Sequence, residues 1–129
     1  MVRSANESKR EPLASPRLLI VEDDVVLARV LQRSFERRGY SVGLVPGAAE
    51  LERHLPLAEF GYAVVDLNTK AGSGLPCVRQ LRAHDPAMII VAIAGALRDA
   101  AEALRLGVRE HLTMPVSTDD IEGAMIRAK

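Results

Sequence analysis

The stretch Leu18-Leu19-Ile20-Val21-Glu22-Asp23-Asp24 places four apolar residues directly before three acidic ones. A second run of this kind, Tyr62-Ala63-Val64-Val65, ends at Asp66. A short apolar run between polar residues is typical of a buried strand in a parallel sheet. Side chains just beyond the C-terminal ends of such strands lie in the crevice where open α/β sheets bind ligands. If the two strands are neighbours, several carboxylates meet in one pocket. Because like charges repel, this arrangement predicts a divalent cation and Mg²⁺-dependent phosphate chemistry.

The composition of the chain indicates one soluble globular domain. Its 129 residues are 48% hydrophobic and 26% charged, with a formal net charge of zero, and this balance argues against nucleic-acid binding, which needs a basic stripe. The single cysteine, Cys77, excludes an intrachain disulfide and fits a reducing compartment. The longest apolar stretch, residues 87–94, is too short to span a membrane. The polar N-terminus has no signal-peptide core, so we expect a cytoplasmic protein.

Apolar runs alternate with segments of helical periodicity along most of the chain. Residues 1–16 are polar and predict a flexible N-terminal leader, which leaves residues 17–129 for the folded domain. Five such repeats of strand and helix predict a doubly wound parallel sheet of the α/β class. We expect strands over residues 18–21, 40–45, 61–65, 88–94 and 108–112, and helices over residues 27–38, 48–55, 75–83, 98–106 and 118–128.

Five ordered motifs carry a resemblance to a known family. They are residues 18–24, Ala63-Val64-Val65-Asp66-Leu67, Gly72-Ser73-Gly74-Leu75, Leu106-Gly107 and Leu112-Thr113-Met114-Pro115-Val116. With these motifs, residues 17–128 resemble the response-regulator receiver domain of two-component signalling. Glu-Arg-Arg-Gly-Tyr at residues 36–40 and Val-Val-Asp-Leu at residues 64–67 look closest to receivers of global redox-type regulators. The resemblance implies a flavodoxin-like (βα)5 fold with strand order 2-1-3-4-5.

The resemblance also implies roles for the acidic residues. Asp66 matches the phosphoacceptor of the family, and Glu22 and Asp23 match the acidic pair that holds Mg²⁺. Asp66 itself and the backbone carbonyl of Asn68 complete the expected metal ligands. Asp24 is expected to be a surface residue or the N-cap of the following helix, where a carboxylate suits the helix dipole.

Three switch positions of the family pattern are degenerate. Ala94 stands where receivers carry a Thr or Ser that bonds the phosphoryl group, and Met114 stands where they carry a Lys. His111 occupies the aromatic switch position, and the segment between Ala94 and Gly107 looks two residues short. We therefore expect an acidic pocket that is preserved while conventional switching is lost. Pro115 matches the position of a cis-proline in the family.

Two single residues also have a plain structural interpretation. Cys77 is more readily a core residue than a redox sensor, because it stands beside Val78 in an expected helix. His111 is more readily a packed or surface histidine than a pH sensor.

The sequence favours an atypical receiver domain, not an enzyme, that signals through protein interaction. Its partner would be a histidine kinase or other signalling protein, and it would regulate transcription through an output domain outside this chain. A homodimer would form through the face of the helix over residues 98–106, the strand over 108–112 and the last helix. This face carries Arg98, Asp99, Glu102, Arg105, Arg109 and Glu110.

Two alternatives stay open. One is a working phosphoacceptor that a histidine kinase phosphorylates on Asp66. The other is a small phosphate-handling enzyme, which ranks last because the sequence offers neither a general base nor a substrate pocket. We expect no membrane contact and no direct nucleic-acid binding by this domain.

Overall fold

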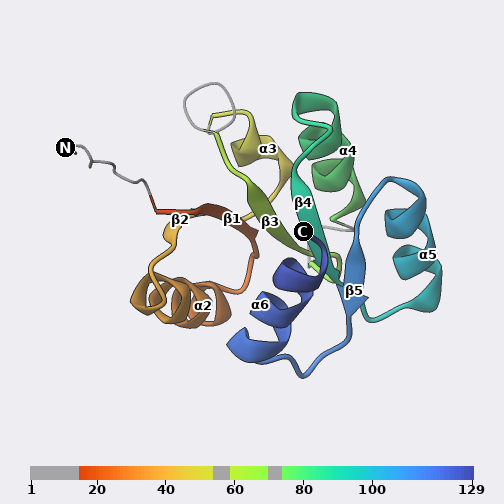
Figure 1. Cartoon of the computed structure of the whole chain (residues 1–129). Coiled ribbons are helices and arrows are strands. Elements are labelled where there is room, and N and C mark those ends of the chain that lie inside the picture. Colours follow the sequence, from red (N-terminus) through yellow and green to blue (C-terminus); the bar gives the residue numbers. More distant parts are fainter. Residues whose placement is uncertain (1–14, 54–58, 70–73) are drawn as a thin grey trace.

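The computed structural model describes residues 15–53, 59–69 and 74–129, and it is a three-layer α/β fold (Figure 1). A sheet of five parallel strands has the order β2-β1-β3-β4-β5, as expected. The strands are β1 (Arg17–Val21), β2 (Ser41–Val45), β3 (Tyr62–Asp66), β4 (Ile89–Ile93) and β5 (Glu110–Leu112). The helices are α2 (Val25–Arg37), α3 (Ala48–Leu51), α4 (Leu75–His84), α5 (Leu97–Arg105) and α6 (Thr118–Arg127).

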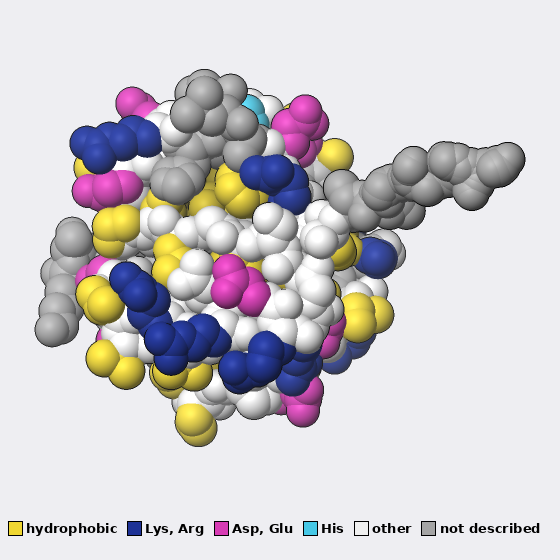
Figure 2. Space-filling model, turned by 90° about the vertical axis from the view of Figure 1, so that its left-hand side faces the viewer, with side chains coloured by type: hydrophobic (Ala, Val, Ile, Leu, Met, Phe, Trp, Pro, Cys, Tyr) yellow, Lys and Arg dark blue, Asp and Glu magenta, His cyan; other side chains and the backbone are white. Residues whose placement is uncertain are grey.

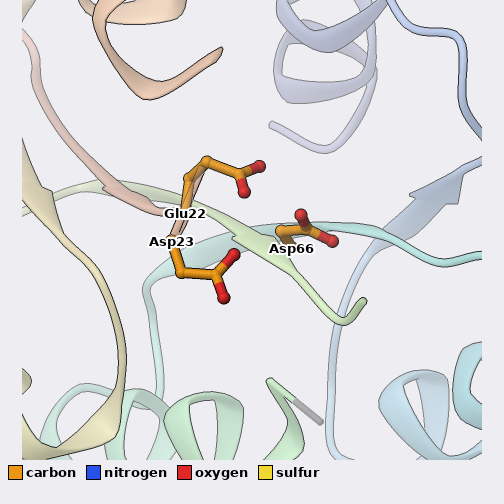
Figure 3. A group of neighbouring side chains, drawn as sticks. All are labelled: Glu22, Asp23 and Asp66. Atoms are coloured by element: carbon orange, nitrogen blue, oxygen red, sulfur yellow. The ribbon is translucent and has the colours of Figure 1, made fainter. Parts of the chain in front are cut away.

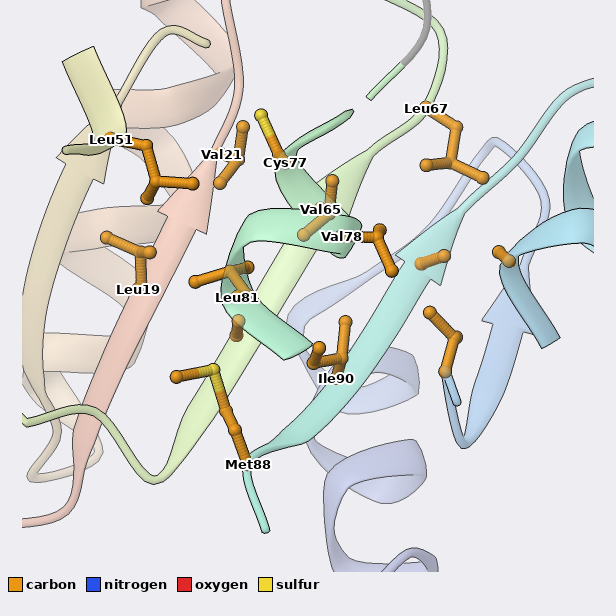
Figure 4. Close-up of a cluster of buried hydrophobic side chains, with 14 of the residues drawn as sticks. Leu19, Val21, Leu51, Val65, Leu67, Cys77, Val78, Leu81, Met88 and Ile90 are labelled. Carbon is orange, nitrogen blue, oxygen red and sulfur yellow. The ribbon is translucent and has the colours of Figure 1, made fainter. Parts of the chain in front are cut away.

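Helices cover both faces of the sheet, so the central strands are buried on both sides. Leu19 and Val21 of β1 pack in the core that includes residues of α3, α4 and α5, part of which Figure 4 shows. Leu18 and Ile20 pack in the second core, which includes residues of α2 and α6. A strand with two buried faces needs apolar residues at successive positions, which explains the continuous apolar run before Glu22.

Most expected elements are confirmed, with differences at their ends. Helix α2 begins at Val25, two residues before the expected start, because the Asp24 side chain caps it. Helix α3 ends at Leu51 and not at residue 55, and β5 begins at Glu110 and not at residue 108. Val108 is nevertheless buried in the core.

Some expectations lie wholly or partly outside the described residues. They are the leader over residues 1–16, of which residues 1–14 are not described, the segment 54–58 after α3, and residues 70–73 of the loop between β3 and α4. The domain boundary after residue 16 stays a prediction. Among the described residues, no helix has the length and apolarity that crossing a bilayer requires.

The outer face of α2 carries positive charge and apolar side chains together. Figure 2 shows this side of the molecule, with a row of basic side chains beside hydrophobic ones. Arg29, Arg33 and Arg37 are exposed and recur every four residues, which aligns them along one face of the helix. Val25 and Val26, in the first turn, are exposed as well.

Candidate acidic metal and phosphoryl site

Three carboxylates meet at the C-terminal edge of the sheet. Glu22 and Asp23 follow β1, and Asp66 ends β3, the strand paired with β1 through Val21 and Val65. Carboxylate oxygens of the three residues all lie within 4.8 Å of one another. Figure 3 shows their side chains facing one small space. The expected convergence of these acids is therefore present in the structure.

Glu22 is the most enclosed member of the cluster. Its side chain is 6% exposed, and its Oε2 accepts a hydrogen bond from the Asp24 backbone N–H at 3.1 Å. Its Oε1 is buried and has no hydrogen-bond partner among the described residues. Burial and the neighbouring carboxyl groups of Asp66 and Asp23 raise the pKa of Glu22 from 4.5 to about 8. An enclosed carboxylate oxygen without a partner fits a site for a hard cation such as Mg²⁺, which takes oxygen ligands.

The neighbours of Asp66 are closely packed. Its Oδ1 accepts a hydrogen bond from the Asn68 backbone N–H at 2.7 Å, which fixes the turn that follows β3. A Cβ atom on Gly95 would lie 2.6 Å from the Asn68 side-chain nitrogen, so that position has room only for glycine unless the amide moves. Asn68 thus lies at the same edge as the carboxylates, while its role as a metal ligand stays a prediction.

Asp24 has a structural task instead of a place in the cluster. Its Oδ1 accepts hydrogen bonds from the backbone N–H groups of Val26 and Leu27, at 3.0 and 3.1 Å. It is therefore the N-cap of α2, one of the two expected positions for this residue.

The three residues predicted to be degenerate switch positions lie on β5 or just after β4 and β5. Ala94 directly follows β4, is fully buried, and its N–H donates to the Leu112 carbonyl oxygen. Met114 is 51% exposed, and its peptide bond to Pro115 is cis, as expected. His111 lies on β5 and is partly buried, and its Nδ1 is buried without a hydrogen-bond partner among the described residues.

Cys77 lies in the core, as expected. It is buried in α4 and packs in the same cluster as Val21 and Val78 (Figure 4). Burial, together with the charge of Glu50, raises the pKa of its thiol, so the thiolate that redox chemistry needs is disfavoured.

Some charged residues of the expected dimer face form salt bridges within the chain. Arg105 pairs with Glu102, and Arg127 of α6 pairs with Glu110 of β5. Arg109 donates to the Ala128 carbonyl oxygen at 2.9 Å. Leu97 of α5 is 82% exposed and adds an apolar part to this surface, which the charge pattern of the sequence does not indicate.

Comparisons with known proteins agree with this architecture. A family model described as the response regulator receiver domain matches residues 18–126. The acid tolerance regulatory protein ActR of Rhizobium meliloti (strain 1021) is 35% identical over 112 residues, which cover 85% of this chain and 58% of ActR. The photosynthetic apparatus regulatory protein RegA of Rhodovulum sulfidophilum is 33% identical over 122 residues, which cover 93% of this chain and 67% of RegA.

A solved structure agrees in fold as well. A response regulator protein from Burkholderia pseudomallei, with a phosphorylated aspartic acid, calcium ion and citrate, matches with a TM-score of 0.80 and 27% identity. The match covers 85% of this chain and 66% of that chain. The chain spans less than two thirds of the length of ActR, so the similarity concerns only this part of the regulator. Together the family model, the strand order and the relatives show that this chain belongs to the response regulator receiver domain family.

Proposed function

We propose that this chain is an atypical receiver domain. Its acidic pocket would bind Mg²⁺ and a phosphoryl group, but phosphorylation would not drive the usual conformational change in the rest of the domain. One observation carries the proposal. Glu22, Asp23 and Asp66 lie together, and Glu22 has an enclosed oxygen without a partner. On the other side of the site, Ala94 and Met114 offer neither a hydroxyl nor an ammonium group.

The chemistry of the pocket suits phosphoryl transfer to Asp66. A carboxylate oxygen of Asp66 would attack the phosphorus of the donor, and the bond from phosphorus to the donor's leaving atom would break, which forms an acyl phosphate. Bound Mg²⁺ would neutralise charge on the phosphoryl oxygens. Glu22 and Asp23 would hold this cation, and the Asn68 N–H, which donates to Asp66 Oδ1, would keep the nucleophile in place.

The residues at positions 94 and 114 would weaken the response to that phosphoryl group. A hydroxyl on residue 94 would donate a hydrogen bond to it, and an ammonium on residue 114 would pair with its charge. Ala94 and Met114 can make neither contact. The acyl phosphate would therefore lack this hydrogen bond and this ion pair, and with them the contacts that would link it to β4 and β5. The domain would then signal mainly through its contacts with other proteins and not through a conformational change caused by phosphorylation.

The partners would be a histidine kinase or other signalling protein and an output domain outside this chain that regulates transcription, all in the cytoplasm. A donor to Asp66 must cover the edge of the sheet where α2 begins. Val26, in the first turn of α2, is 75% exposed, and Arg29 and Arg33, which follow it in the helix, are exposed too. This surface therefore suits a donor with apolar and acidic side chains.

A homodimer is proposed on the face of α5, β5 and α6. Leu97 and Leu104 are exposed on α5 beside the charged pairs of Glu102 and Glu110. The same patch on two copies would pair isologously. Light scattering on the wild type and on Leu104→Glu tests this, with a dimer expected for the first and a monomer for the second. A monomeric wild type at millimolar concentration would refute it.

The alternative is a working phosphoacceptor, phosphorylated on Asp66 by a histidine kinase. The partial exposure of Asp66 at the sheet edge favours it, because a donor can reach the carboxylate. Phosphorylation of Asp66 would then change the surfaces that bind partners, without the hydroxyl and ammonium groups that receivers usually carry at positions 94 and 114.

Incubation with Mg²⁺ and acetyl phosphate or beryllofluoride tests the pocket and separates the two versions. Intact mass and NMR spectra should show an adduct on the wild type and none on Asp66→Asn. In an atypical receiver the spectral changes stay at the ends of β1 and β3, whereas in a working switch they extend to β5 and α6. No adduct at any Mg²⁺ concentration would exclude both versions of the phosphoacceptor.

A further inference from the structure

A cavity of about 460 Å³ lies beside the acidic cluster, between the end of β1 and the first turns of α3 and α4. It exists because its lining includes very small residues, among them Gly47, Ala48 and Gly74. A Cβ atom on Gly74 would lie 2.5 Å from the Asp66 carbonyl oxygen, so a larger residue cannot fill the space from that side without displacing backbone. The volume falls in the range of small-molecule sites, roughly 300–1,000 Å³.

The wall of the cavity is apolar with carboxylates at defined places. Val21, Pro46 and Pro76 supply apolar surface. Among the described residues, the charged members of the lining are Asp23 and Glu50, and both are acidic. Glu50 stands in the first turn of α3 and belongs to the lining.

Cys77, which is buried, also forms part of the lining. Its side chain is 2% exposed, and it is the only cysteine in the chain. The charge of Glu50 reaches this thiol, since it contributes to the raised pKa of Cys77. The carboxylate of Glu50 therefore adds negative charge near the part of the wall that Cys77 forms.

We infer that this cavity binds a small organic cation, with an ammonium or amidinium group on a short apolar body. The apolar wall would take the body, and the carboxylates would take the charge, since a cation is favoured and an anion disfavoured in a cleft lined by acids. Asp23 belongs to the acidic cluster too, so a bound cation would lie next to the proposed Mg²⁺ site. The inference does not depend on phosphorylation of Asp66.

Cys77 gives a direct test of charge selection inside the cavity. A methanethiosulfonate reagent transfers its sulfur-bearing group to the thiolate, which forms a disulfide and releases methanesulfinate. The rates of Cys77 modification by the cationic 2-aminoethyl and the anionic 2-sulfonatoethyl reagents are measured by intact mass in EDTA. Each rate is divided by the rate with free N-acetylcysteine. We expect the cationic reagent to be favoured at least about tenfold, as a nearby carboxylate in a partly enclosed site would cause.

Matched variants assign this preference to the cavity. Glu50→Gln should lower it at least about threefold. Glu52 is exposed, directly follows α3 and lies outside the lining. Glu52→Gln should therefore leave the preference for the cationic reagent unchanged. Equal normalised rates for the two reagents, or no reaction with either in the folded protein while the urea-unfolded protein reacts, would overturn the inference.

Reversible ligands provide the second measurement. Benzylamine, benzyl alcohol and benzoate have nearly the same shape and differ in charge. Benzylamine should slow Cys77 modification and shift the backbone amide signals of Gly47, Ala48 and Gly74, and the other two should act at least about tenfold more weakly. Equal effects of benzylamine and benzoate, or no amide shift with benzylamine at 50 mM, would contradict an organic-cation site.

Discussion

Replacing Glu22 by Gln should stabilise the metal-free protein at alkaline pH. The pKa of Glu22 rises from 4.5 to about 8 on folding, so the folded state binds a proton that the unfolded state has released. Stability therefore falls as the pH rises from 4.5 towards 8. The difference between the two pKa values limits this loss of stability to about 5 kcal/mol. Relaxation of the protein and solvent around the charged carboxylate reduces the loss. We therefore expect Glu22→Gln to be about 1–3 kcal/mol more stable than the wild type at pH 8.

Glutamine keeps the contacts that the site offers to an uncharged side chain. Its amide oxygen can accept the Asp24 N–H that now donates to Glu22 Oε2 at 3.1 Å, and its amide nitrogen can donate towards Asp66. Urea unfolding followed by circular dichroism at pH 5, 6, 7 and 8 in EDTA measures the difference. The curves of variant and wild type should converge near pH 5 and diverge above it, while the exposed Glu52→Gln control follows the wild type.

Magnesium should narrow the difference in stability between Glu22→Gln and the wild type. The wild type gains about 1.4 kcal/mol when Mg²⁺ stands at ten times its Kd, whereas Glu22→Gln loses one ligand and gains less. A constant difference between variant and wild type from pH 5 to 8 would refute the assignment of the raised pKa to Glu22. Equal stabilisation of both proteins by Mg²⁺ would refute its role as a ligand.

Three further predictions concern the switch, the core and the contact between Tyr40, just before β2, and α6. Met114→Lys should lengthen the lifetime of the acyl phosphate on Asp66 at least about threefold by adding a cation, as acid quenching and intact mass would show; an unchanged lifetime means that the ammonium does not reach the phosphoryl group. Leu81→Ala should cost about 2–5 kcal/mol in urea unfolding, because the side chain is fully buried between α4 and the sheet; a loss below 1 kcal/mol would contradict that packing. Tyr40→Phe removes the hydrogen bond from Tyr40 Oη to Glu122 at 2.9 Å and should cost about 1 kcal/mol by the same method, while a neutral effect would show that this contact adds nothing.

The fold could be predicted because its decisive signals are local. Buried parallel strands require continuous apolar runs, and residues 18–21 and 62–65 have them. The convergence of Glu22 and Asp66 followed from the rule that parallel strands end at one edge of the sheet. The short α3 could not be predicted in the same way, because residues 52 and 53 continue its composition but lie in a turn.

Other features depend on distances that a sequence does not contain. The enclosure of Glu22 arises from its place between Asp66 and the backbone of Val45, whose carbonyl accepts the Glu22 N–H at 3.0 Å. The pairs of Glu102 and Glu110 on the expected dimer face depend on side-chain orientation. The row of Arg29, Arg33 and Arg37, in contrast, has a spacing of four and could have been found from the sequence alone.

The electrostatics of the acidic cluster argue for a ligand independently of any family resemblance. An acid whose pKa rises to about 8 through burial and neighbouring acids weakens the fold near neutral pH, so the cluster is not there to hold the structure together. A bound divalent cation would remove that cost, because it would give the enclosed Oε1 of Glu22 a partner and offset the charges of Asp23 and Asp66. Met114 carries no positive charge, so under the proposed function that charge would come from a bound ion or a partner. A degenerate switch, as proposed, would leave a site that depends more on its ligands than a complete receiver pocket would.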